Sequence, residues 1–154
     1  MKKYYFCAAI VAGTLAACVA PRSRKPPSLI EVPKDANFVL SVSEAVLSPE
    51  EDTSSYATIS VGGRSAGRTP AGPRSSDKKW GARFAPGNHL FRFEYWIAAS
   101  SASEHWSPLN AQWQPIERFV RVNDRERLTV TLKFHDGARK HSYQISRDPV
   151  SAIP

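Results

Sequence analysis

Apolar residues recur at every second position in two runs between Tyr56 and Ile97, and this stretch constrains the fold most. Such alternation, in segments rich in β-branched and aromatic residues, predicts strands, because successive side chains of a strand point to opposite faces. Gly62-Gly63 after the first run can supply the positive φ angles of a tight hairpin turn. The residues expected to face the core are Ala57, Ile59, Val61, His89, Phe91, Phe93 and Tyr95.

Further strands are predicted on both sides of this stretch. The same alternation occurs in residues 37–47, 116–122 and 127–134, and a short strand is expected at 142–145. Residues 80–84 are expected to pair with 89–97 across the Pro86-Gly87 turn. The fold class is therefore all-β: a small antiparallel β-sandwich of about seven strands with two long loops.

The two predicted loops differ in composition. Residues 98–115 are small and polar apart from Trp106 and Trp113. Residues 64–83 hold six cations against the single Asp77, in a chain whose formal net charge is +7. Concentrated positive charge attracts anionic partners, although a basic balance also simply promotes solubility. The six cations are Arg64, Arg68, Arg74, Lys78, Lys79 and Arg83.

The N-terminus has the features of an export signal. Two lysines precede an apolar run from Tyr4 to Ala17 that is too short to span a bilayer of about 30 Å comfortably. The following Leu15-Ala16-Ala17-Cys18 resembles the lipobox of bacterial lipoproteins. The resemblance implies that residues 1–17 are removed and that Cys18 carries fatty acyl chains such as palmitate. Val19 after the cysteine, rather than aspartate, implies the outer membrane, facing the periplasm or the cell surface.

The mature chain then divides into three parts. Residues 18–36 contain four prolines and several cations without periodicity, which is typical of a tether. Residues 37–135 form the predicted β-sandwich, and residues 136–154 are expected to be a tail. No disulfide is expected, because Cys7 would leave with the signal.

A family resemblance covers about residues 56–134. The segment from Ala57 to Pro70 resembles the PEGA-type repeat, with a strand, a glycine turn, a short strand and a Gly-basic-Thr-Pro ending. Residues 86–93 and 128–132 fit its later turn and strands, whereas residues 71–83 and 98–115 are longer than its connections. The resemblance implies a small β-sandwich of bacterial envelope proteins that acts as an interaction or spacer module without catalysis.

The sequence contains no complete motif for nucleotide binding, metal binding or hydrolysis. Gly62 to Thr69 nearly matches a phosphate-binding loop, but Arg68 replaces its lysine and prolines follow where a helix should begin. His135, Asp136 and His141 could approach a metal, although nothing in the sequence fixes their geometry. Glu104-His105 lies among serines without a Gly-x-Ser-x-Gly turn. We therefore expect no catalytic residue, metal or cofactor.

The sequence leaves binding as the main expectation. Aromatic residues beside arginines are common in interfaces, so we predict binding of an envelope protein or an anionic glycan, and no nucleic acid. Alternatives are a structural subunit of an envelope or secretion assembly, a small hydrolase, and tryptophans that only form a second core. The predicted binding residues are Arg64, Arg68, Arg74, Lys78, Lys79, Trp80, Arg83, Trp96 and Trp106.

Overall fold

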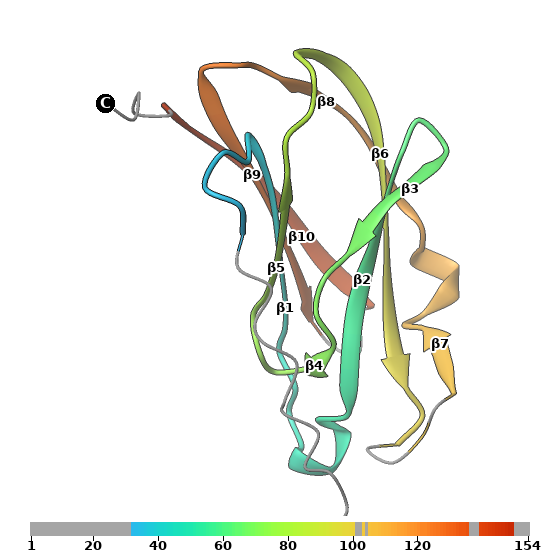
Figure 1. Ribbon diagram of the computed structural model, residues 1–154. Helices are drawn as coiled ribbons and strands as arrows, with labels where there is room; N and C mark the ends of the chain where they lie inside the picture. The colour runs from blue at the N-terminus through green and yellow to red at the C-terminus, as the bar shows by residue number, and fades with distance from the viewer. Residues whose placement is uncertain (1–31, 101–102, 104, 136–138, 150–154) are drawn as a thin grey trace, which may run out of the picture.

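Two β-sheets face each other in the computed structural model, which describes residues 32–100, 103, 105–135 and 139–149 (Figure 1). This confirms the all-β sandwich. Two short 3-10 turns, η1 (Pro49–Glu51) and η2 (Ala111–Trp113), interrupt the strands. The strands are β1 (Phe38–Glu44), β2 (Ser54–Val61), β3 (Arg64–Arg68), β4 (Gly72–Pro73), β5 (Lys78–Ala82), β6 (Gly87–Ala98), β7 (Trp106–Pro108), β8 (Ile116–Val122), β9 (Glu126–His135) and β10 (Lys140–Pro149).

The strand order defines the two sheets. Sheet A has the order β10-β9-β1-β5, and sheet B has the order β3-β2-β6-β7, with β4 beside β2 and β8 beside β6. All pairs are antiparallel except β1 and β9, which run parallel. The expectation of a purely antiparallel sandwich is wrong at this pair. Parallel neighbours need a long connection, and here the strands of sheet B lie between β1 and β9 in the chain.

The core lies between the sheets, where the sequence alternation places it. The predicted inward residues of β2 and β6 are buried, apart from the partly exposed Val61 and His89. The alternating apolar residues of β1, β8 and β9 are buried as well. Phe38 of sheet A stacks on Phe91 of sheet B, with ring centroids 4.2 Å apart. The glycine turn between β2 and β3 is also confirmed, since Gly62 and Gly63 have φ angles of 56° and 80°.

The predicted pairing of residues 80–84 with 89–97 is wrong. Strand β5 pairs with β1, while β6 pairs with β2 on one side and with β7 and β8 on the other. Both edges of β6 are thus occupied by other strands. The Asn37 side chain holds the segment after β5 against sheet A: its amide donates to the Phe84 carbonyl and its carbonyl accepts from the Phe84 N–H, both at 2.8 Å.

The two predicted loops and the tail contain more structure than expected. Residues 64–83 form β3, β4 and β5, and residues 98–115 contribute β7 and η2. The tail forms β10, which extends sheet A beyond residue 135, the predicted end of the sandwich. The signal segment, Cys18 and most of the tether lie outside the described residues. Within the described ranges, no helix is long and apolar enough to cross a membrane.

Candidate functional site

The cations of residues 64–83 do not form one basic surface, because two of them are buried. Arg74 and Lys78 are 8% and 3% exposed. Lys78 lies opposite Val42 in the ladder between β5 and β1, so its side chain points into the sandwich. Their burial argues against the predicted role of these two cations in binding a partner. Strand alternation turns every second residue inward, whatever its charge.

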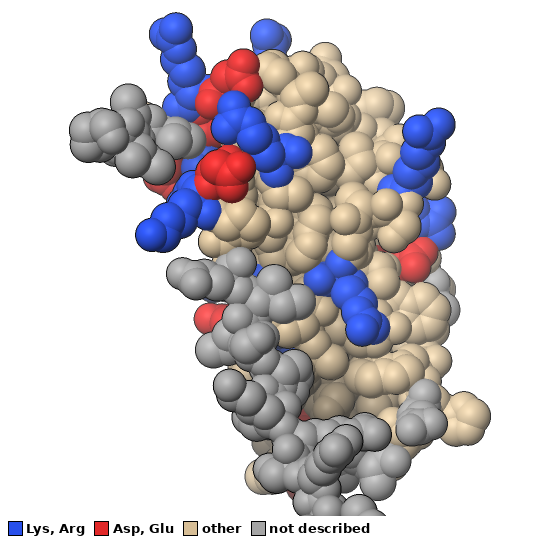
Figure 2. Space-filling model, in the orientation of Figure 1, with Lys and Arg blue, Asp and Glu red and all other residues tan. Residues whose placement is uncertain are grey.

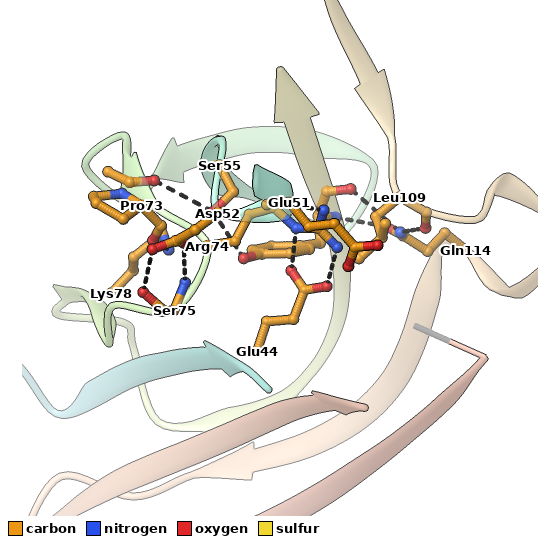
Figure 3. A network of polar contacts seen from close by, with 12 residues as sticks. Glu44, Glu51, Asp52, Ser55, Pro73, Arg74, Ser75, Lys78, Leu109 and Gln114 are labelled. Atoms are coloured by element: carbon orange, nitrogen blue, oxygen red, sulfur yellow. Dashed lines mark hydrogen bonds and ion pairs between the residues drawn. The ribbon is translucent and has the colours of Figure 1, made fainter. Parts of the chain in front are cut away.

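Arg74 is held by a buried ion pair. Its guanidinium donates to both carboxylate oxygens of Glu44, with Nε 2.9 Å from Oε2, and its Nη1 donates to the Glu51 carbonyl at 2.9 Å (Figure 3). The bond to Glu44 raises the pKa of Arg74. A buried charge must be paired, so this contact fixes the end of β1 against the segment that follows β4.

Lys78 lies beside this pair at the same end of the core (Figure 3). Its ammonium donates to the carbonyls of Pro73 at 2.6 Å and Ser76 at 3.0 Å, and it lies 5.9 Å from the ring centroid of Tyr95. Burial lowers the pKa of Lys78 to about 8, although the nearby Glu44 carboxylate opposes the shift. Burial also raises the pKa of Tyr95, whose hydroxyl donates to Ser55 Oγ at 2.8 Å.

Further contacts join the segments at this end of the sandwich. Asp52 accepts from the Ser75 N–H at 2.8 Å and from its hydroxyl at 2.7 Å, which lowers the pKa of Asp52. Glu44, Asp52, Arg74 and Lys78 each have a polar partner there (Figure 3). The same end holds a polar groove of about 410 Å³ lined by Glu44, Ala45, Leu47, Ser48, Glu51, Arg74 and Arg139.

The remaining cations of this segment point in different directions. A bulge in β3 places Arg68 opposite Thr58, on the outer face of sheet B, and Arg64 opposite Val61, on the other face. Lys79 lies opposite Ser41 on the outer face of sheet A. Arg83 is exposed and lies 3.8 Å from Asp124. Figure 2 accordingly shows charges of both signs and no continuous basic surface on this side of the molecule.

Trp80 is partly buried and packs against the core. It points inward from β5, opposite Leu40, and its ring centroid lies 6.3 Å from that of Phe38. Its indole also covers Gly67 of β3, where an added Cβ would lie 2.6 Å from Nε1. Trp80 thus joins the edges of the two sheets, and its predicted role in binding is not supported by its position.

The other two predicted tryptophans lie together on the outer face of sheet B. Tyr56 and Pro108 are opposite Trp96 in the ladders, and Trp106 is opposite Ala98, so all share this face. The Tyr56 ring centroid lies 4.7 Å from that of Trp106 and 6.4 Å from that of Trp96. Arg68 places its guanidinium 5.4 Å from the Tyr56 ring centroid. We call Tyr56, Arg68, Trp96, Trp106 and Pro108 the aromatic face.

A shallow groove of about 190 Å³ adjoins the aromatic face. It is lined by Arg92, Glu94, Trp96, Pro108, Gln114 and Pro115. Gln114 fixes the wall, because its amide accepts from the Tyr95 N–H at 2.5 Å and donates to the carbonyls of Tyr95 and Leu109. The indole N–H of Trp96 has no acceptor among the described residues. The charges are balanced, since Arg92 lies 2.7 Å from Glu94 and 3.6 Å from Glu117.

The sequence missed Tyr56 and Gln114 as members of this site. The alternation of β2 already placed Tyr56 on the outer face, but its contact with Trp106 depends on β7, which was not predicted. The position of Gln114 depends on the fold of the 98–115 insertion and had no local signal. Exposed apolar side chains elsewhere include Phe119 on β8, at 78%, and Trp113 in η2, at 53%.

The described residues contain no candidate metal site. No group of three or more His, Cys, Asp or Glu that could hold a metal occurs among them. His141 lies on β10, where its ring approaches Phe134, and Asp136 lies outside the described residues. His89 donates a hydrogen bond from Nε2 to the Ala85 carbonyl at 2.8 Å. Comparison with protein families, curated proteins and solved structures finds no match for this chain.

Proposed function

We propose that this chain is a non-catalytic lipoprotein of the bacterial cell envelope that binds a partner protein through the aromatic face. Acyl chains on Cys18 would anchor it, with the outer membrane as the destination, facing the periplasm or the cell surface. The lipobox-like Leu15-Ala16-Ala17-Cys18 supports the anchor. Each buried methylene contributes about 0.8 kcal/mol, so several acyl chains hold a protein of this size firmly.

One observation carries the binding proposal. On the outer side of sheet B, Tyr56 of β2 contacts both Trp96 of β6 and Trp106 of β7, and all three remain partly exposed. Tyrosine, tryptophan and arginine are the residues that most often dominate the binding energy of protein interfaces. Rings already fixed by a sheet lose little conformational entropy on binding.

The charges favour a protein partner over an anionic glycan. Among the cations of residues 64–83, Arg74 and Lys78 are buried and Arg64 and Arg68 lie on opposite faces. Arg92 beside the groove is already matched by two glutamates. Binding of a polyanion relies on concentrated unmatched positive charge, which the aromatic face does not offer.

Photo-crosslinking in intact cells tests this proposal. A photoreactive amino acid in place of Trp106 reports on the aromatic face, and the same amino acid in place of Lys133 reports on the exposed outer face of sheet A. We expect a discrete, protease-sensitive adduct at position 106 and no adduct at position 133. The adduct at position 106 should decrease when Arg68→Ala is added. Equal adducts at both positions, or none, would contradict binding through this face and favour a purely structural subunit. An adduct that survives protease would indicate a glycan.

A further inference from the structure

Strand β10 forms a long open edge of sheet A beside β9 (Figure 1). It pairs with β9 over ten consecutive residues without a register shift, and no strand within the described part of the chain pairs with its other side. Unpaired backbone along an edge is a template for another strand. We propose that β10 pairs antiparallel with β10 of a second copy of this chain, about a twofold axis at Gln144.

The hydrogen bonds of sheet A show which backbone groups of β10 are free for this pairing. Leu128 N–H donates to the Asn37 carbonyl at 2.9 Å, and Ala45 N–H donates to the Phe134 carbonyl at 3.0 Å. Even-numbered residues of β9 therefore turn their backbone groups toward β1, and odd-numbered residues turn theirs toward β10. Because odd residues of β9 oppose even residues of β10, the N–H and C=O groups of odd-numbered β10 residues point away from β9.

The continuity of the sheet faces and a charge pair select Gln144 as the centre of the twofold axis. Residues opposite each other in an antiparallel pair share a face, so only a centre on a residue of β10 keeps the two sheets continuous. With the centre at Gln144, Lys140 lies opposite Asp148 of the second copy. Tyr143 then lies opposite Ile145 of the second copy. A centre at Tyr143 or Ile145 loses the charge pair, and opposite charges facing each other across strands stabilise the pair.

The side chains of β10 also favour pairing of a second strand along its open edge. Ile145 is 44% exposed on the side of the sheet that faces the core, and a neighbouring strand would cover it. Arg147 would lie opposite His141 of the second copy, but its charge is already matched by Glu126 at 3.2 Å. The other outer strands are shorter: β3 and β5 have five residues each, β7 has three and β8 has seven, and β3 also carries a bulge.

Disulfide trapping tests the register. The full chain with Cys7→Ser and Cys18→Ser receives either Gln144→Cys or, as a matched control, Ser142→Cys. Both positions lie on the outer face of sheet A. At the centre, the two Cβ atoms would be about 4.5–5.5 Å apart, close to the requirement of a disulfide. The two copies of position 142 would be offset by four residue steps, which is roughly 13 Å along the strand.

We expect Gln144→Cys to form covalent dimers under mild oxidation and Ser142→Cys to remain monomeric. Equal crosslinking at both positions, at neither, or only at 142 would overturn the proposal. Light scattering of the cysteine-free chain provides an independent measurement. Asp148→Lys should weaken association about three- to tenfold, and adding Lys140→Asp should restore it, because the exchange regenerates both charge pairs. A double variant as weak as the single one would also overturn the proposed pairing.

Discussion

At the scale of single residues, the least expected feature is the buried ammonium of Lys78. The side chain lies at one end of the core, and its neighbours are Glu44, Asp52, Asp77, Arg74 and Tyr95. Its neighbour Lys79 lies exposed on the opposite face of the same strand. The two lysines are adjacent in sequence and identical in chemistry, yet only Lys79 can be changed without disturbing the core. The expectation that both contribute to one charged surface fails for this reason.

The depressed pKa of Lys78 predicts a pH dependence of stability. Between pH 8 and about 10.5 the unfolded chain binds a proton that folded Lys78 has released, so the free energy of unfolding rises with pH. Comparing pH 7.5 with pH 9.5, we expect Lys78 to contribute an increase of roughly 2 kcal/mol. Urea unfolding of Lys78→Met, in which this increase is absent, checks the assignment. Parallel curves for the two proteins would contradict it.

At the scale of the elements, period-two alternation fixes the faces of the strands. Phe93 of β6 is 2% exposed and stacks near Phe91, with ring centroids 6.0 Å apart. Thr131 of β9 lies on the outer face of sheet A, between Ser41 and Gln144 in the ladders. Both residues belong to central strands, so they differ mainly in the face on which they lie.

Truncation of these two residues should therefore have unequal effects. Phe93→Ala deletes a buried ring and leaves a cavity, so we expect a loss of about 3–5 kcal/mol in the free energy of unfolding. Thr131→Ala should lower it by less than about 1 kcal/mol, as is usual for a substitution outside the core. Denaturant unfolding measures both values. A comparable loss in the two variants would mean that the faces of β6 and β9 are assigned incorrectly.

At the scale of the whole molecule, the proposed anchor and the aromatic face belong to different parts of the chain. Cys18 precedes the described residues, whereas the aromatic face lies on sheet B. Loss of the anchor should therefore move the protein without unfolding the sandwich.

The location can be tested with Cys18→Ser. We expect this variant to lose its acyl mass and leave the membrane fraction, or to remain unprocessed, because the thiol that receives the lipid is absent. Mass spectrometry of the N-terminus and membrane fractionation measure both effects, with Cys7→Ser as the matched control that keeps the anchor. A wild-type mature chain without acyl mass, or one that starts at another residue, would disprove the lipoprotein proposal.

Local sequence patterns predict strands β1, β2, β6, β8 and β9, their inward faces and the Gly62-Gly63 turn. Alternation and turn chemistry are local properties, so they can be recognised without knowing what each strand packs against. The tertiary structure decided which strands pair. Strand β5 joins β1 rather than β6 because β6 already has neighbours on both edges.

The tertiary structure also decided which charges and aromatic rings remain available. Arg74 is buried because Glu44, distant in sequence, meets it at the end of β1, and a paired charge can leave water. Trp80 packs on Gly67, while Tyr56, Trp96 and Trp106 meet on the outer face of sheet B. Residue type alone predicts that the cations are exposed and that the tryptophans contact a binding partner. Their actual neighbours come from strands far apart in the chain, and only the packing of the two sheets brings them together.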